Sequence, residues 1–179
     1  GVGVNLGNLA ARQGDITLDA NGKMVVKESI ASGSLTAKGD GVTLTGSHKA
    51  GGDIAVNSTQ DVALNNATLA ADGKLTLAAT GNTTLTASKI AAGQTALSAK
   101  QINGDAASQL SAAGNATLDA QDISWQGELT SGGNSRITAD KLDNAGTITA
   151  KGQLTATTGN LNNSGTLQGQ ALEINSQTA

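Results

Sequence analysis

The chain has 179 residues and a formal net charge of −3 at pH 7, and it contains no Pro, Cys, Phe or Tyr and only one Trp, one Met and one His. The absence of Cys excludes disulfides, thiolate metal sites and cysteine nucleophiles, and the scarcity of aromatic residues excludes a core built from rings. The small net charge does not favour nucleic acid as a partner, and no apolar run is long enough to span a membrane.

The first residues, 1–13, read GVGVNLGNLAARQ and differ from the repeating units after them, so they are predicted to form one irregular coil. From Gly14 onward the chain repeats at intervals of about 19 residues, and each unit opens on Gly. The unit openings of the first half read GDITLDA, GSLTAKG, GDIAVNS, GKLTLAA and GQTALSA, in which apolar residues alternate with polar ones. A period of two, with Thr, Val and Ile enriched, predicts short β-strands.

The second half repeats without gaps in three units, 114–132, 133–151 and 152–168. Its apolar positions recur in three columns, and a fourth column is glycine: Leu118, Ile137 and Ala156; Ile123, Leu142 and Leu161; Leu129, Ile148 and Leu167; Gly127, Gly146 and Gly165. One unit offers too few apolar side chains to bury its own hydrophobic face, whereas stacked units share a continuous core. Residues 169–179 are predicted to form a partial last coil.

These features predict an all-β fold, a parallel β-helix of about nine coils with roughly 19–20 residues per coil. The whole chain, 1–179, is expected to be a single β-helix segment in which residues 14–168 form eight coils. A narrow interior suits Ala, Val and Leu better than rings, and Pro would interrupt ladders that have a strand on both sides. A β-sandwich of antiparallel hairpins also gives short alternating strands, but it does not require apolar columns that stay in register.

The segments LDNAGTITAKGQLTATT and LNNSGTLQGQALEI, which start at Leu142 and Leu161, share the pattern L-x-N-x-G-x-L/I. This pattern resembles the haemagglutinin repeats of large two-partner-secretion exoproteins, a family that includes filamentous haemagglutinin and the contact-dependent growth inhibition toxins. The resemblance covers essentially the whole chain and is sharper from Gly93 onward. It implies a right-handed β-helix that forms the shaft of a fibre, secreted by or displayed on the outer surface of a Gram-negative bacterium. No secretion domain and no toxin module is recognised in the segment.

Trp125 takes the column position that Asn144 and Asn163 hold in the next two units. Two interpretations stay open. The indole fills the interior beside Gly104 of the neighbouring coil, or it projects outward as a contact for a partner, since Trp is frequent in binding hot spots. It is the only partner-binding residue that the sequence suggests. The asparagines of this column are expected to turn a corner and to stack as an amide ladder.

His48 lies in GVTLTGSHKAGG, which aligns without gaps to NTTLTASKIAAG at 82–93. This alignment places His48 opposite Lys89 at an outward position, and Lys49 opposite the apolar Ile90. We therefore expect a solvated surface histidine beside a loose corner. A metal site is not expected, because the chain offers no second His and no Cys to complete one.

Enzymes that act on polysaccharides also use β-helices, but they need clustered acids and a nearby base. Here the acids are spread along the chain, Asp119 and Asp122 are the closest aligned pair, and the only arginines are Arg12 and Arg136. The sequence therefore predicts no catalytic, metal-binding or cofactor-binding residue, and the chain is not expected to be an enzyme.

Two classes of function remain, and a polysaccharide-active enzyme is a remote third. The first class is a rod segment of a filamentous adhesin that supports attachment to host or neighbouring cells. The second is the stalk of a contact-dependent growth inhibition toxin. The resemblance implies an outer-membrane secretion partner for the full-length protein and an unknown cell-surface receptor or glycan. The end ALEINSQTA has no cap, which predicts weak end-to-end self-association through strand pairing.

Overall fold

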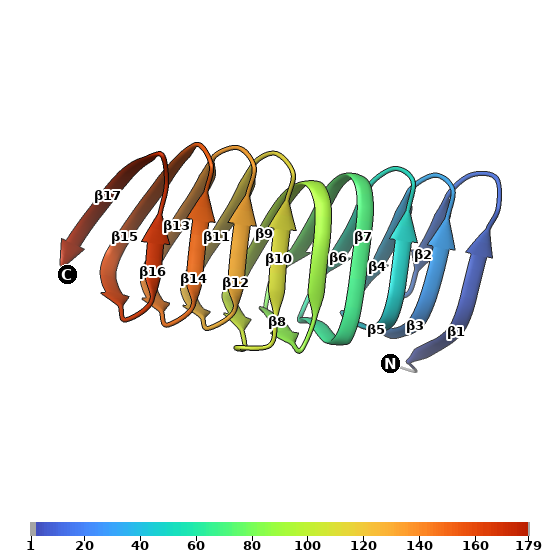
Figure 1. Cartoon of the computed structure of the whole chain (residues 1–179). Coiled ribbons are helices and arrows are strands. Elements are labelled where there is room, and N and C mark those ends of the chain that lie inside the picture. Colours follow the sequence, from blue (N-terminus) through green and yellow to red (C-terminus); the bar gives the residue numbers. More distant parts are fainter. Residues whose placement is uncertain (1–2, 179) are drawn as a thin grey trace.

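The computed structural model describes residues 3–178, and these residues form a rod of stacked coils built from parallel strands, without a helix among them (Figure 1). The rod has about nine turns of roughly 19 residues, so the predicted all-β parallel β-helix is confirmed. Its strands, in chain order, are β1 (Val4–Ala11), β2 (Ile16–Asp19), β3 (Lys23–Ala31), β4 (Leu35–Gly39), β5 (Gly41–Ala50), β6 (Ile54–Ser58), β7 (Val62–Ala79), β8 (Asn82–Thr86), β9 (Lys89–Gly104), β10 (Gln109–Ala112), β11 (Ala116–Trp125), β12 (Glu128–Ser131), β13 (Ser135–Asn144), β14 (Thr147–Ala150), β15 (Gln153–Asn163), β16 (Thr166–Gln168) and β17 (Ala171–Thr178).

Each turn contributes strand segments to three faces of the rod, and long strands such as β7 and β9 pass round corners from one face to the next. Face A contains β2, β4 and β6 in the first half of the rod. In the second half it contains the first parts of β11, β13 and β15, followed by β17. Face B contains β8 and the last parts of β9, β11, β13 and β15. Face C contains β10, β12, β14 and β16, which lie at the front of Figure 1. Every inner coil is therefore hydrogen-bonded to the coil before it and the coil after it.

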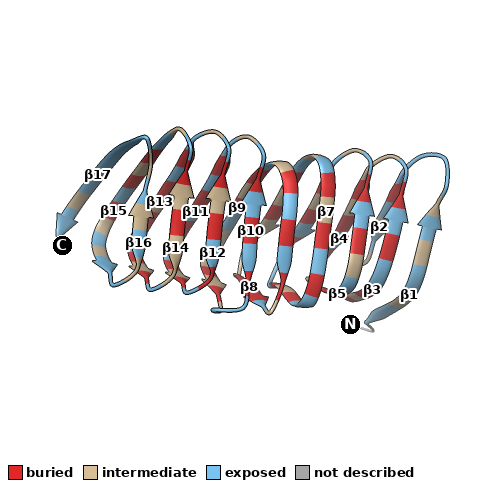
Figure 2. Ribbon diagram, viewed as in Figure 1, coloured by how far each residue is buried: buried red, intermediate tan, exposed pale blue. Residues whose placement is uncertain are grey.

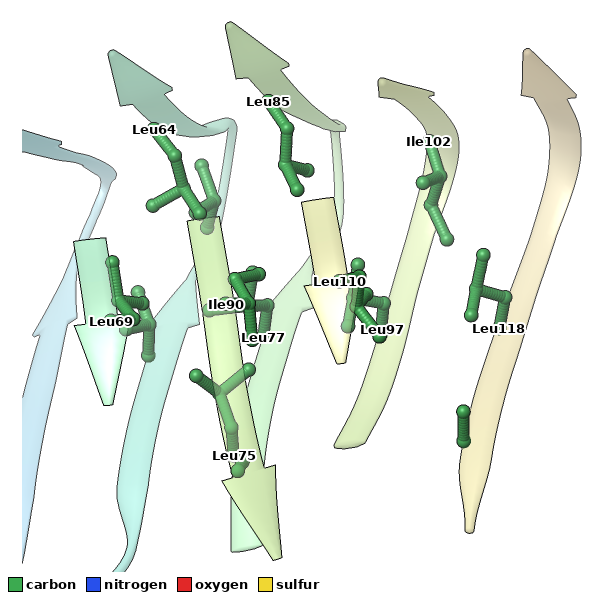
Figure 3. Close-up of a cluster of buried hydrophobic side chains, with 14 of the residues drawn as sticks. Leu64, Leu69, Leu75, Leu77, Leu85, Ile90, Leu97, Ile102, Leu110 and Leu118 are labelled. Atoms are coloured by element: carbon green, nitrogen blue, oxygen red, sulfur yellow. The ribbon is translucent and has the colours of Figure 1, made fainter. Parts of the chain in front are cut away.

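Buried residues alternate with exposed ones along the strands and recur from coil to coil, except in β1 and in the last two strands (Figure 2). Leu142 stacks between Ile123 and Leu161, as the repeat predicts. The column of Leu129, Ile148 and Leu167 is likewise confirmed. In the middle of the rod the leucines and isoleucines of all three faces meet in one cluster (Figure 3). Each fully buried side chain of this size contributes about 1.5–3 kcal/mol of hydrophobic stabilisation.

The strands at both ends of the described chain pair with the neighbouring coil. Strand β1 pairs with β3 from Val4 to Ala11, and β17 pairs with β15 from Ala171 to Thr178. Residues 1, 2 and 179 lie outside the described residues. The division of the chain into an irregular first coil, eight coils and a partial last coil stays a prediction.

A one-residue bulge changes the register in the first half of the rod. Thr45 of β5 pairs with Asn65 of β7, whereas Gly46 pairs with Ala67, so Asn66 has no partner on β5. Gly46 and Asn66 have φ values of 70° and 49°, a left-handed conformation that Gly and Asn tolerate better than other residues. A shift of one residue in a strand moves each following side chain to the opposite face.

Candidate functional site

Trp125 lies in the interior of the rod, and its exposed fraction is 0%. It stands at the end of β11, between Gly104 and Asn144 in the same column of face B. A Cβ built on Gly104 would lie 2.5 Å from Cζ3 of the indole, so the ring fills the space of the missing side chain. This position matches the packing interpretation of Trp125. A contact with a partner stays a prediction, and it would require the indole to leave the core.

Asn144 and Asn163 continue the Trp125 column as the expected amide ladder. Nδ2 of Asn144 donates to Oδ1 of Asn163 at 2.7 Å and to the carbonyl of Thr166 at 3.1 Å. Two buried polar atoms nearby have no hydrogen-bond partner among the described residues, namely Nε1 of Trp125 and Oδ1 of Asn144. The column thus changes from apolar to polar at Trp125, and this change leaves one donor and one acceptor unsatisfied in adjacent coils.

His48 is fully buried, so the expectation of a solvated surface histidine is wrong. Because of the bulge at Gly46, His48 pairs with Leu69 and points inward, and Lys49 takes the outward position instead. The gap-free alignment with 82–93 was shifted by one residue at this point. His48 therefore occupies a column that Leu69 and Ile90 continue in the next two coils.

The His48 ring is held by hydrogen bonds on both of its nitrogens. Nδ1 lies 2.8 Å from Oγ of Ser29, and Nε2 lies 2.9 Å from the carbonyl oxygen of Thr45. A carbonyl only accepts, so Nε2 carries the proton and the Ser29 hydroxyl donates to Nδ1. Desolvation by burial lowers the pKa of His48, while the bond to Thr45 and the charge of Glu28 act in the opposite direction. The histidine is therefore neutral at pH 7, and it supports the backbone at the bulge.

Many carboxylates are used at the corners of the coils, where they hold the backbone of a neighbouring coil. Oδ1 of Asp15 accepts a hydrogen bond of 2.7 Å from the N–H of Ser34. The carboxylate of Asp105 accepts from the Ser108 hydroxyl at 2.6 Å and from the N–H of Ala87 at 3.0 Å. These bonds, that of Ser108 above all, lower the pKa of Asp105. Such acids stabilise corners, as N-terminal caps do in helices.

Within residues 3–178 no three His, Cys, Asp or Glu side chains are placed so that they could hold a metal ion. Asp119 and Asp122, the aligned pair in the sequence, both lie on β11 and are exposed. Asp122 accepts a weak hydrogen bond from Nε2 of Gln101 at 3.4 Å. The described part of the chain also has no helix that is long and apolar enough to cross a membrane.

The outer surface is hollowed along the corner where face A meets face B. An open groove of about 820 Å³ extends along this corner from Ser98 to Gln177. A smaller hollow of about 210 Å³, bordered by Ser58 and Ala79, lies at the same corner earlier in the rod. No motif in the sequence pointed to this groove. The sequence feature that corresponds to the groove is a small residue at the same position of five successive coils: Ala99, Ala120, Ala139, Thr158 and Ser176.

The fold and its surface define a β-solenoid shaft, a rod with an apolar interior and polar outer columns. The chain is 38% identical over 122 residues to Toxin CdiA of Escherichia coli, a match that covers 68% of this chain. It is 67% identical over 61 residues, 34% of the chain, to tRNA nuclease CdiA of Escherichia coli strain NC101. It is 61% identical over 57 residues, 32% of the chain, to 16S rRNA endonuclease CdiA of Enterobacter cloacae subsp. cloacae.

These relatives are CdiA proteins, exoproteins of contact-dependent inhibition and two-partner secretion, so the resemblance to the haemagglutinin-repeat shaft of such exoproteins is confirmed. The three matches span 2–4% of the relatives' own lengths. No protein-family model matches the chain, and no solved structure matches it.

Proposed function

We propose that this chain is a stalk segment of a contact-dependent growth inhibition exoprotein, secreted by or displayed on a Gram-negative bacterium. The observation that carries the proposal is the 38% identity with Toxin CdiA over 122 residues, which is more than half of the rod. The shape of the molecule supports it, because parallel coils that pair on both sides make a stiff rod. The segment would extend the parts of the full-length protein that meet a target cell.

The nuclease activities in the names of two relatives are not proposed for this segment, since the matched regions are 2% of those proteins. The chain's one histidine is engaged inside the rod with Ser29 and Thr45. We propose a non-catalytic role, in which the secretion partner in the outer membrane and the target receptor belong to the full-length protein.

A rod segment of an adhesin is the second candidate function. The same stiff shaft could hold an attachment site away from the cell surface, and the exposed polar columns are compatible with either role. The names of the relatives favour the toxin stalk, because the curated matches are CdiA proteins.

Whole-coil deletion tests the stalk proposal in bacteria that produce the full-length exoprotein. Removal of residues 133–151 deletes one unit and rejoins the coils in register, whereas removal of residues 133–142 deletes about half a unit and misaligns every later column. We expect the first variant to reach the surface and to inhibit neighbouring cells that lack immunity, and the second to lose both properties. Immune neighbours serve as the control.

Equal loss of surface display in both deletions would contradict a shaft made of exchangeable coils. A full-length protein that promotes attachment to cells but never inhibits growth of non-immune neighbours would contradict the toxin stalk and support the adhesin. The two candidates are thus separated by one co-culture experiment with an attachment assay beside it.

A further inference from the structure

The groove between faces A and B is a feature that a simple spacer does not need. It crosses five coils, from Ser98 on β9 to Gln177 on β17, which is a length of roughly 19 Å at a strand spacing of about 4.8 Å. Its volume of about 820 Å³ lies within the range of known ligand sites. We propose that this groove binds a linear, uncharged polysaccharide that lies along the rod axis. This inference goes beyond the proposed role of the chain as a stalk.

The floor of the groove is narrow and rigid. Ala120 pairs with Ala99 on one side and with Ala139 on the other, and Ala139 pairs with Thr158. These side chains are small and point inward, so they do not fill the outer surface at this corner of the coils. Because β9, β11, β13 and β15 are hydrogen-bonded to strands on both sides and β17 is paired with β15, the groove is already formed before a ligand arrives. Binding therefore requires little ordering of the protein.

Polar side chains border the groove in successive coils. Asp119, Thr138 and Thr157 project from adjacent strands of face A in strict register. Gln121 and Asp140 lie on the other side of the bend. Carboxylates accept hydrogen bonds, while amides and hydroxyls both donate and accept, so each coil offers partners for the hydroxyl groups of a sugar. A sugar polymer that lies along the rod axis would therefore meet hydrogen-bonding side chains from successive coils.

The charge of the lining selects against anionic polymers. Asp119 and Asp140 are the charged residues of the lining, and neither forms an ion pair within residues 3–178. Two carboxylates without a cation repel a polymer that carries uronate, sulfate or phosphate. An extended peptide lying along the axis would find no free strand edge in β9, β11, β13 and β15, because these strands of the floor are paired on both sides. A neutral polysaccharide needs only the side-chain donors and acceptors that the groove offers.

Two matched arginine substitutions on β15 test the proposal. Thr157→Arg places a long cationic side chain in the groove, and Thr155→Arg places the same side chain two residues earlier, on face A outside it. The probes are maltohexaose, cellohexaose and mannohexaose, with oligogalacturonate and oligolysine as charged comparisons. Binding is followed by NMR through the side-chain amides of Gln121 and Gln177, and circular dichroism verifies the fold of each variant.

We expect at least one neutral oligosaccharide to shift these amide signals. Thr157→Arg should weaken its binding about tenfold or more, whereas Thr155→Arg should leave it unchanged. Asp140→Ala removes one charged acceptor and should weaken binding by about tenfold, which provides a second variant if Thr157→Arg disturbs the coil.

Three results would overturn the proposal: no shift with any neutral probe at millimolar concentration, tighter binding of oligogalacturonate or oligolysine than of every neutral probe, or equal loss of affinity in both arginine variants. Any of these results leaves the stalk function intact, because that function is measured separately in co-culture.

Discussion

The indole of Trp125 occupies the place of a side chain at Gly104 in the preceding coil, since a Cβ on Gly104 would lie 2.5 Å from Cζ3 and 2.6 Å from Cε3. The two coils before Gly104 fill the same column with Leu64 and Leu85. One large ring and one absent side chain therefore replace two side chains of medium size, and the interior stays filled.

Gly104→Ala should destabilise the rod, because the added methyl group collides with the fully buried Trp125 ring. The expected loss is about 1–3 kcal/mol in the free energy of unfolding, measured by urea denaturation. Gly7→Ala is the matched control, since a Cβ at Gly7 meets nothing within 4 Å. Equal stability of the Gly104 and Gly7 variants would show that the ring has room to move.

Trp125→Leu should lower the free energy of unfolding by about 2 kcal/mol, because it leaves a cavity above Gly104. The double variant Gly104→Ala with Trp125→Leu should lose less than the sum of the two single losses, since the added methyl group then enters the cavity. A double-mutant cycle measures this coupling. Strict additivity would contradict the packing relationship between the two positions.

The buried His48 should make stability depend on pH below the ordinary histidine pKa of 6.5. Above that pH the ring is neutral in both states and adds no dependence. As the pH falls below it, the unfolded chain takes up a proton that the folded chain resists, so the free energy of unfolding decreases until the pH reaches the lowered pKa of the folded state. Denaturant midpoints across this interval measure the effect.

The double variant Ser29→Ala with His48→Leu should lose this part of the pH dependence. It replaces the polar pair by apolar side chains like those of Leu69 and Ile90 in the same column, and such a replacement is often neutral or stabilising. Glu28 is present in both proteins, so the comparison isolates the histidine. Parallel pH profiles for the two proteins would argue against a lowered His48 pKa.

Leu142→Asp should be severely destabilising, by more than about 4 kcal/mol, because a carboxylate would lie unpaired between Ile123 and Leu161 in the interior. Thr149→Asp, on the outer side of β14, is the control and should change stability little. Thermal melts of the two variants provide the measurement. An unchanged melting temperature for Leu142→Asp would mean that the stacking register is wrong.

The chain should associate weakly end to end through β17, whose outer edge pairs with no other described strand. Leu172 and Ile174, which continue inward columns, are 50% and 42% exposed there. In a parallel ladder, successive N–H groups of one strand point alternately to its two sides. The N–H of Glu173 points to β15, and the N–H of Ile174 points to the free edge. Sedimentation at rising protein concentration measures the association.

Ile174→Pro removes a donor from the free edge and should weaken the association without opening the β15–β17 ladder. Glu173→Pro removes a donor from the ladder itself and should release β17. Gln170→Lys adds charge outside the edge and should have little effect. A strictly monomeric chain up to millimolar concentration would show that the edge is tolerated without pairing.

The sequence predicted the second half of the rod well because its units have equal length. With no insertion between Gly114 and Leu167, the columns of Leu142 and Ile148 could be read directly, and the structure places them as expected. The same reasoning failed at His48, because the coil that contains His48 is one residue shorter than the coil with which it was aligned. Alignment of Ala50-Gly51 with Ala92-Gly93 would have placed His48 on the apolar Ile90.

The groove could not be read from the sequence in the same way. Its lining comes from residues about 19 positions apart, and each of them alone is an ordinary Ala, Thr or Asp. Only when Ala120 and Ala139 are stacked does the low corner appear, with Asp119 and Asp140 on its two sides.

The sequence by itself determined the class of architecture. Its apolar residues recur with a period of two within strands and with a period of about 19 between coils, and stacked parallel coils bury the resulting apolar columns. The tertiary structure decided where single residues point. A bulge at Gly46 turned His48 inward, and a glycine in the neighbouring coil gave Trp125 its place. The physical reason is that alternation along a strand is a local property, whereas register depends on hydrogen bonds and packing between coils, where a shift of one residue exchanges the inner and outer surfaces.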